Sequence, residues 1–102
     1  MHIINTTFHV HKTVRSAFLS WLRTVYVEAA TATGFLTNPS LTRVIGHDDP
    51  DGSSYALQLS CPSLREAVRW HDDTAVLLRD DMQARFGEQV LFFTTYLEVI
   101  DL

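Results

Sequence analysis

The sequence predicts an α+β fold in which four strands form one antiparallel sheet and two helices cover one face of it. Three observations support this prediction. Residues 2–11 and 54–61 alternate between apolar and polar side chains, as half-buried strands do. Residues 12–33 and 63–86 repeat apolar side chains at spacings of three and four, which is typical of amphipathic helices. A dense turn signal at 48–52 separates two of the strands.

The first predicted strand, residues 2–11, has one apolar face and one more polar face. Side chains at alternate positions of a strand point to the same side. The apolar face consists of Ile4, Thr6, Phe8 and Val10. The other face consists of Ile3, Asn5, Thr7, His9 and His11.

The first predicted helix, residues 12–33, has a single apolar stripe. The stripe consists of Val14, Phe18, Trp21, Leu22, Val25 and Ala29. Gly34 follows, and glycine is the residue that most easily adopts the left-handed conformation that ends many helices.

A hairpin is predicted next, with strands at 41–47 and 54–61. Its turn is the stretch DDPDG at 48–52, in which Pro50 presets φ and Gly52 permits positive φ. One face of the returning strand consists of Tyr55, Leu57, Leu59 and Cys61.

The second predicted helix begins after Ser63 and stops at Gly87. Ser63 and Glu66 fit the S-x-x-E pattern of a capping box. Its apolar stripe consists of Leu64, Ala67, Val68, His71, Ala75, Leu78, Met82 and Phe86. The last segment, EQVLFFTTYLEVIDL at 88–102, is predicted as a strand that is apolar on both faces.

The resulting order βαββαβ is the ferredoxin-like plan, with strands in the spatial order 4-1-3-2 and one domain over residues 1–102. A strand that is apolar on both faces is usually covered on both. We therefore expect a homodimer joined through the open sheet face, including the strand at 90–100. The alternative is that an irregular C-terminal tail covers this face within one chain.

Composition excludes several classes of function. The formal net charge is −4 and the eight Lys and Arg residues form no cluster, which argues against nucleic acid as a partner. One cysteine, Cys61, permits no intramolecular disulfide and fits a cytoplasmic location. No signal peptide is recognised, and no apolar run reaches the roughly 20 residues of a membrane helix.

Several segments resemble a family of uncharacterised bacterial proteins of roughly this length, known as a domain of unknown function. They are NTTFHV at 5–10, FLSWLRTVYV at 18–27, ATGFLTNPSLTRV at 32–44, DGSSYALQL at 51–59, Trp70, and FGEQVLFFTTYLEVIDL at 86–102. The resemblance implies a ferredoxin-like fold of the dimeric α/β-barrel kind. That group includes small monooxygenases, haem-binding proteins and stress-response proteins. The resemblance supplies no reaction.

Two sets of side chains are candidates for a site. A ligand pocket between the sheet and the helices could be lined by Asn5, Arg43, Tyr55, His71, Trp21 and Trp70. The alternative is that the aromatic residues form plain core, that His71 lies at its edge, and that Arg43 reaches solvent or an interface ion pair.

A metal ion could be held by His9, His11 and His47, with Asp48 or Asp49 nearby. The alternative is that these histidines are hydrogen-bonded surface groups, with His11 accepting from the first N–H groups of the helix that follows.

We expect a small binding or interaction domain with no established chemistry and no cofactor. The alternative is a cofactor-free monooxygenase-like or isomerase-like enzyme that uses His71, Tyr55 or Asn5 on a small-molecule ligand. A metal- or haem-binding protein that uses His9 and His11 is the third possibility.

Overall fold

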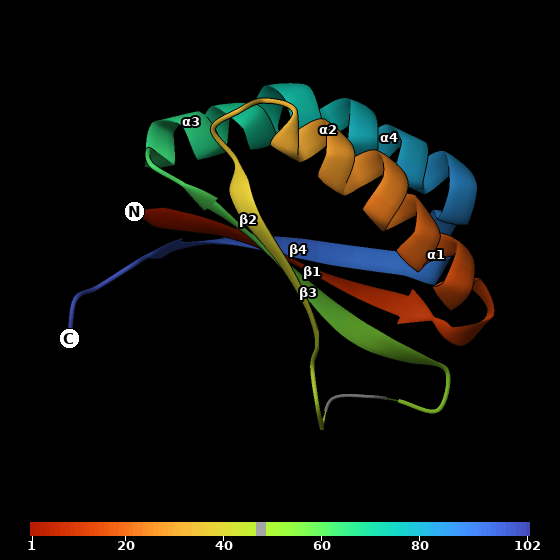
Figure 1. Cartoon of the computed structure of the whole chain (residues 1–102). Helices are drawn as coiled ribbons and strands as arrows, with labels where there is room; N and C mark the ends of the chain where they lie inside the picture. The colour runs from red at the N-terminus through yellow and green to blue at the C-terminus, as the bar shows by residue number, and fades with distance from the viewer. Residues whose placement is uncertain (47–48) are drawn as a thin grey trace.

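The computed structural model describes residues 1–46 and 49–102, and within them an antiparallel sheet of four strands carries the helices on one face (Figure 1). The strands lie in the order β2-β3-β1-β4, which confirms the predicted order 4-1-3-2 and the ferredoxin-like plan. Their bounds are β1 (His2–His11), β2 (Thr37–Arg43), β3 (Gly52–Cys61) and β4 (Val90–Glu98).

The central strand β1 pairs along its length with β3 on one side and β4 on the other. His2 lies opposite Cys61 and Glu98, and Val10 lies opposite Ser53 and Val90. Burial alternates along β1 as predicted, because every second side chain points toward the helices.

Each of the two predicted helices is continuous but contains one π-helical turn. The first helix consists of a 3₁₀ turn (Lys12–Val14), α1 (Arg15–Trp21), a π turn (Leu22–Tyr26) and α2 (Val27–Thr31). The second consists of α3 (Leu64–Arg69), a π turn (Trp70–Thr74) and α4 (Ala75–Phe86), followed by a 3₁₀ turn (Gly87–Gln89). The Ser63 hydroxyl accepts the backbone N–H of Glu66, so the predicted cap is present.

Near the π turns the buried positions differ from the predicted apolar stripes. A π turn contains one residue more than an α turn, so the residues after it rotate around the helix axis. In the first helix Tyr26 and Ala30 are buried in place of the predicted Val25 and Ala29. In the second helix Trp70, where the π turn begins, is buried in place of the predicted His71, whereas Ala75, Met82 and Phe86 after the turn are buried as predicted. The two turns meet, because the rings of Tyr26 and Trp70 lie 6.0 Å apart.

The core lies between the sheet and the helix layer. Phe8 of β1 is at its centre and packs against Phe18 at 5.2 Å and Tyr26 at 5.9 Å between ring centroids. Tyr55, Leu57, Leu59 and Cys61 of β3 are buried there, as predicted.

The edge strand β2 differs from its prediction, since it spans Thr37–Arg43 rather than 41–47. Pro39 lies inside it, which an edge strand permits because one side of its backbone needs no ladder partner. Asn38 has φ of 53°, and the pairing with β3 is irregular between Thr37 and Ser40. This bulge lets the strand begin earlier than the sequence pattern suggests.

Within the described ranges, the sheet face away from the helices carries no covering element, and we call it the open face (Figure 1). The last strand is shorter than predicted, ending at Glu98, and residues 99–102 form an exposed tail. On the open face of β4 the side chains of Leu91, Phe93 and Leu97 are apolar and exposed, and Thr95 is polar. Val99 and Ile100 of the tail are exposed as well. The predicted apolar character of both faces of β4 is therefore present, but this face is bare.

Candidate functional site

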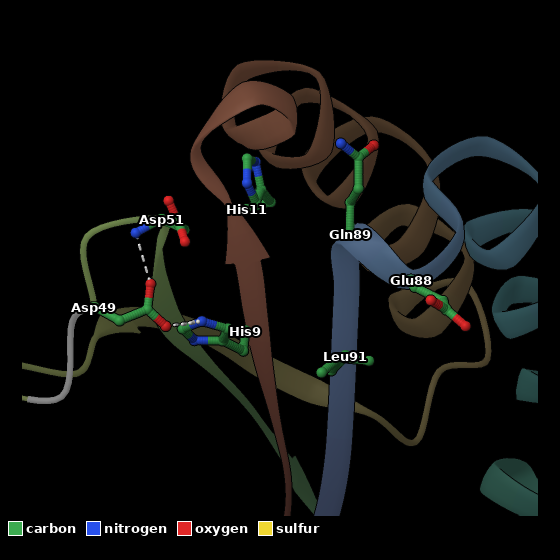
Figure 2. Close-up of a pocket in the computed structure, with 7 residues that line it drawn as sticks. All are labelled: His9, His11, Asp49, Asp51, Glu88, Gln89 and Leu91. Carbon is green, nitrogen blue, oxygen red and sulfur yellow. Dashed lines mark hydrogen bonds and ion pairs between the residues drawn. The ribbon is translucent and has the colours of Figure 1, made fainter.

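Two hollows indent the open face beside the hairpin that joins β2 to β3. The first, which we call the hairpin hollow, has a volume of about 330 Å³ (Figure 2). It is lined by His9, His11, Asp49, Asp51, Glu88, Gln89 and Leu91. The second, the sheet hollow, has a volume of about 400 Å³ and is lined by Thr7, Val44, Ser54 and Phe93.

His9 lies where the two hollows meet and uses both of its ring nitrogens. Its Nδ1 lies 2.9 Å from the Ser54 hydroxyl, because His9 and Ser54 are directly opposite in the pairing of β1 with β3. Its Nε2 lies 2.9 Å from Oδ2 of Asp49 in the hairpin (Figure 2). Serine, histidine and aspartate thus form a continuous hydrogen-bonded chain that comes from three segments.

The Asp49 carboxylate is itself held in place. The backbone N–H of Asp51 donates to its Oδ1 at 2.8 Å (Figure 2). This hydrogen bond, helped by backbone donation from Gly52 and by His9, holds the pKa of the Asp49 carboxyl below its ordinary value. The carboxylate is therefore charged at neutral pH and lies within hydrogen-bond distance of Nε2 of His9. In the tautomer that donates from Nε2 to this carboxylate, Nδ1 accepts from the Ser54 hydroxyl.

Gly52 gives the His9 ring the room that this arrangement needs. A Cβ at this position would lie 2.6 Å from the carbonyl oxygen of Val10 and 3.1 Å from Nε2 of His9. The glycine that ends the turn signal is therefore required by close packing against β1.

His11 has a different role from His9, although the two are separated by one residue. Its Nδ1 accepts the backbone N–H of Thr13 at 3.2 Å and lies 2.8 Å from the Thr13 hydroxyl. It therefore caps the first helical turn, which confirms the alternative given for it above.

Among the described residues, no three His, Cys, Asp or Glu side chains are arranged to hold a metal ion. His47, the third ligand proposed from the sequence, lies outside the described residues, so the set His9, His11 and His47 stays a prediction.

Only some of the six residues predicted to line a pocket between the sheet and the helices lie together in the structure. Trp21, Tyr55 and Trp70 are all buried in the core, and the Trp21 Nε1 donates to Asp81 at 2.8 Å. Tyr26 packs between the two indoles, and burial raises the pKa of its hydroxyl to about 12.

Asn5 does not share this side of the sheet, because the alternation of β1 directs it to the open face. There its amide donates to Thr95 at 3.2 Å and to Thr7 at 3.4 Å. The structure therefore does not bring Asn5 together with the buried aromatic residues.

His71 and Arg43 lie at the margins of the core. The His71 ring packs edge-on against Tyr96 at 6.1 Å, and its Nδ1 lies 3.2 Å from Asp72. Its Nε2 is buried and has no hydrogen-bond partner among the described residues. Arg43 is exposed on β2, opposite Tyr55 in the pairing with β3.

Sequence reasoning missed Ser54, because its contact with His9 depends on a pairing between residues 45 positions apart. Asp49 was considered only as a metal ligand. The signal that could have found both is the turn at 48–52, which returns β3 beside the histidine-bearing strand.

Comparisons with known proteins agree with the fold. Residues 1–100 match the family model described as Domain of unknown function (DUF4286). A comparison with curated proteins found no match.

Several solved structures are similar over almost their whole length. A protein from Deinococcus radiodurans, provisionally named an antibiotic biosynthesis monooxygenase, has a TM-score of 0.67 at 15% identity, over 100% of this chain and 95% of its own. A dimeric ferredoxin-like protein from an uncultured marine organism has a TM-score of 0.66 at 13% identity, over 99% and 98%. A provisionally named monooxygenase of the same kind from Bacillus cereus has a TM-score of 0.54 at 12% identity, over 99% and 96%. At these identities the likeness shows the fold alone.

Proposed function

This chain belongs to the family described as Domain of unknown function (DUF4286), and we propose that it works as a homodimeric binding domain. In this proposal residues 1–102 form a single ferredoxin-like domain, and two copies join through their open faces, including the strand and tail at 90–100. The family supplies no reaction, so the proposal is argued from the surface of the chain.

The observation that carries the proposal is the apolar character of the open face along β4 and the tail. Leu91 and Phe93 are 59% and 61% exposed, and Leu97, Val99 and Ile100 extend the same strip. Burial of a large apolar side chain that is otherwise exposed contributes about 1.5–3 kcal/mol. A two-fold axis buries each of these side chains twice, once in each copy, so the strip is large enough to support association.

Further support comes from the direction of these side chains and from the fold. Open-face residues of a strand project perpendicular to the sheet, which favours a partner sheet packed face to face over one joined at the strand edge. Some proteins with this fold, such as the marine one above, are named as dimeric ferredoxin-like proteins.

The hollows on the open face favour a small molecule as the bound ligand, since their volumes lie within the range of ligand pockets. The net charge of −4 argues against nucleic acid. A cytoplasmic location is supported by the lone cysteine, Cys61, which is a free and buried thiol. The described residues include no helix that is both long and apolar enough to cross a membrane.

A monooxygenase-like or isomerase-like enzyme with a pocket between sheet and helices has less support. The two monooxygenases above carry that name provisionally, and their likeness extends to the fold only. The indoles of Trp21 and Trp70 are occupied by core packing. His71, whose inner nitrogen has no partner, is the polar group that would serve such an enzyme best.

The proposal is tested by the mass of the protein in solution. Light scattering on the wild-type protein should give twice the chain mass of 11.6 kDa. Phe93→Asp should give the mass of one chain, because a charge cannot be buried unpaired in the interface. Leu77→Asp is the matched control, since Leu77 is 75% exposed on α4, away from the open face. A monomeric wild-type protein, or dimers in both variants, would overturn the proposal.

A further inference from the structure

The hydrogen-bonded chain of Ser54, His9 and Asp49 has the order that nucleophilic acyl transfer requires. A serine hydroxyl lies beside an imidazole nitrogen at 2.9 Å, and the other imidazole nitrogen lies 2.9 Å from a carboxylate. Such a set is recognised by the geometry and role of its members rather than by their place in the chain. We propose that Ser54, His9 and Asp49 form a second functional element of this protein, a site that hydrolyses small carboxylic esters.

The protonation states follow from the contacts. Asp49 is fixed by the backbone N–H of Asp51 at 2.8 Å and accepts the proton on Nε2 of His9. The opposite nitrogen, Nδ1, is thereby an acceptor aimed at the Ser54 hydroxyl. His9 is a base toward Ser54, and Asp49 is a positioning residue that also stabilises the imidazolium when it forms.

The sheet hollow indicates the acid part of the substrate. Ser54 opens into this hollow of about 400 Å³, whose other lining residues are Thr7, Val44 and Phe93. None of these four lining side chains is charged, and Val44 and Phe93 supply apolar walls. The hollow therefore suits a small, uncharged, apolar acyl group.

Among the residues that line the sheet hollow, Thr7 is the one besides Ser54 with a hydroxyl, and in this proposal it has the role of oxyanion donor. Its hydroxyl oxygen accepts from the Asn5 amide at 3.4 Å, so its hydrogen can donate to an oxygen atom in the hollow.

The hairpin hollow indicates which kind of alcohol the substrate ester would contain. Asp49, Asp51 and Glu88 are among its lining residues, and Figure 2 shows Asp49 and Asp51 on the hairpin side of His9. Carboxylates favour a polar or cationic alcohol over an anionic one. The proton that His9 takes from Ser54 is on Nδ1, so the leaving oxygen must lie within reach of Nδ1, with the rest of the alcohol extending toward the hairpin hollow.

The reaction is ordinary two-step hydrolysis. Ser54 Oγ attacks the carbonyl carbon as its proton moves to Nδ1 of His9. The bond from that carbon to the alcohol oxygen then breaks, and the alcohol leaves with the proton from His9. A water molecule next attacks the acyl-serine and gives a proton to His9, which returns it to Ser54 as the acid departs. The sum is ester plus water to acid plus alcohol.

The site does not depend on the proposed homodimer, because all three groups belong to one copy. The mass measurement and the test below can therefore fail separately.

The test is covalent labelling of the full chain by a small alkyl fluorophosphonate at neutral pH, with the labelled peptide identified by mass spectrometry. The probe reacts with an activated serine, so we expect a single label on Ser54 and none in Ser54→Ala. His9→Gln should slow labelling by about 100-fold or more, which is the usual contribution of a general base. Ser53→Ala is the matched control, because Ser53 is the neighbouring serine, is buried, and has no contact with His9.

Two further measurements keep the test decisive. The pH profile of the labelling rate should differ between the wild-type protein and His9→Gln, a difference that a merely structural serine would not show. If His9→Gln fails to fold, Asp49→Asn replaces it and should slow labelling at least about 10-fold, because the imidazole loses its orientation. An unlabelled Ser54 in folded wild-type protein, or a rate unchanged in a folded variant of His9 or Asp49, would overturn the proposal.

Discussion

Replacement of Gly52 by alanine tests the close packing between the hairpin and β1. The new Cβ would lie 2.6 Å from the carbonyl oxygen of Val10, which belongs to the central strand. A carbonyl within a fully paired strand cannot move by several tenths of an ångström without disturbing its ladder. The same Cβ would lie 3.1 Å from Nε2 of His9, so it also displaces the ring from Asp49.

The expected loss of unfolding free energy is about 2–3 kcal/mol. Overpacking in a well-packed region costs typically about 1–3 kcal/mol, and the upper half applies here because the obstructing atom is backbone rather than a flexible side chain. The exposed pairing of His9 with Asp49 adds little to this figure. For a chain of this size, each 1 kcal/mol lowers Tm by roughly 4–8 °C.

Urea titration followed by tryptophan fluorescence measures the loss, since Trp21 and Trp70 are both buried. Gly46→Ala is the control variant. Its new Cβ would have no atom within 4 Å, so its only cost is the strain of alanine at a φ of 88°. Left-handed strain of that kind costs about 1–2 kcal/mol. If Gly52→Ala is no more destabilising than Gly46→Ala, the close-packing argument is wrong.

Three further predictions concern single contacts. The hydrogen bond from Trp21 holds the pKa of Asp81 below its ordinary value, so the stability it contributes is present above pH about 4 and is lost as the pH falls through the folded-state pKa. Asp81→Asn should flatten that part of an acid unfolding curve, and an unchanged curve would contradict it. Burial raises the pKa of Tyr26 to about 12, so stability should fall as the pH rises from about 10 to 12, and less so in Tyr26→Phe. Ser63→Ala removes the cap of α3 and should cost about 1 kcal/mol by urea titration, whereas Ser60→Ala should cost little.

The fold could be predicted because its signals are local. The alternation of β1, the two helical stripes and the turn at 48–52 each lie within one segment, and together they determine the order of elements. The π turns could not be predicted, since a single extra residue in a helix leaves no mark on composition. In the first helix the buried positions move by one residue, so Tyr26 and Ala30 rather than Val25 and Ala29 face the core.

Less of the candidate site than of the fold could be predicted from the sequence. The cap formed by His11 could be predicted, because its partner Thr13 is two residues away. The contact of His9 with Ser54 depends on the register between two strands, and a shift of one residue would send either side chain to the other face. Only the folded sheet brings these groups together.

The closeness of the two chain ends has a consequence for protein engineering. The N–H of Val99 donates to the carbonyl of Met1 at 3.0 Å, so the first residue lies next to the end of the last strand. Chain ends that lie close together usually tolerate circular permutation. A permutant that joins residues 99 and 1 through a short linker, and opens the chain within the loop around Gly34, should keep the sheet order. A permutant opened at Pro50 instead would break the connection between β2 and β3. Its stability, compared with that of the first permutant, would measure how much this connection contributes beyond the pairing of the strands.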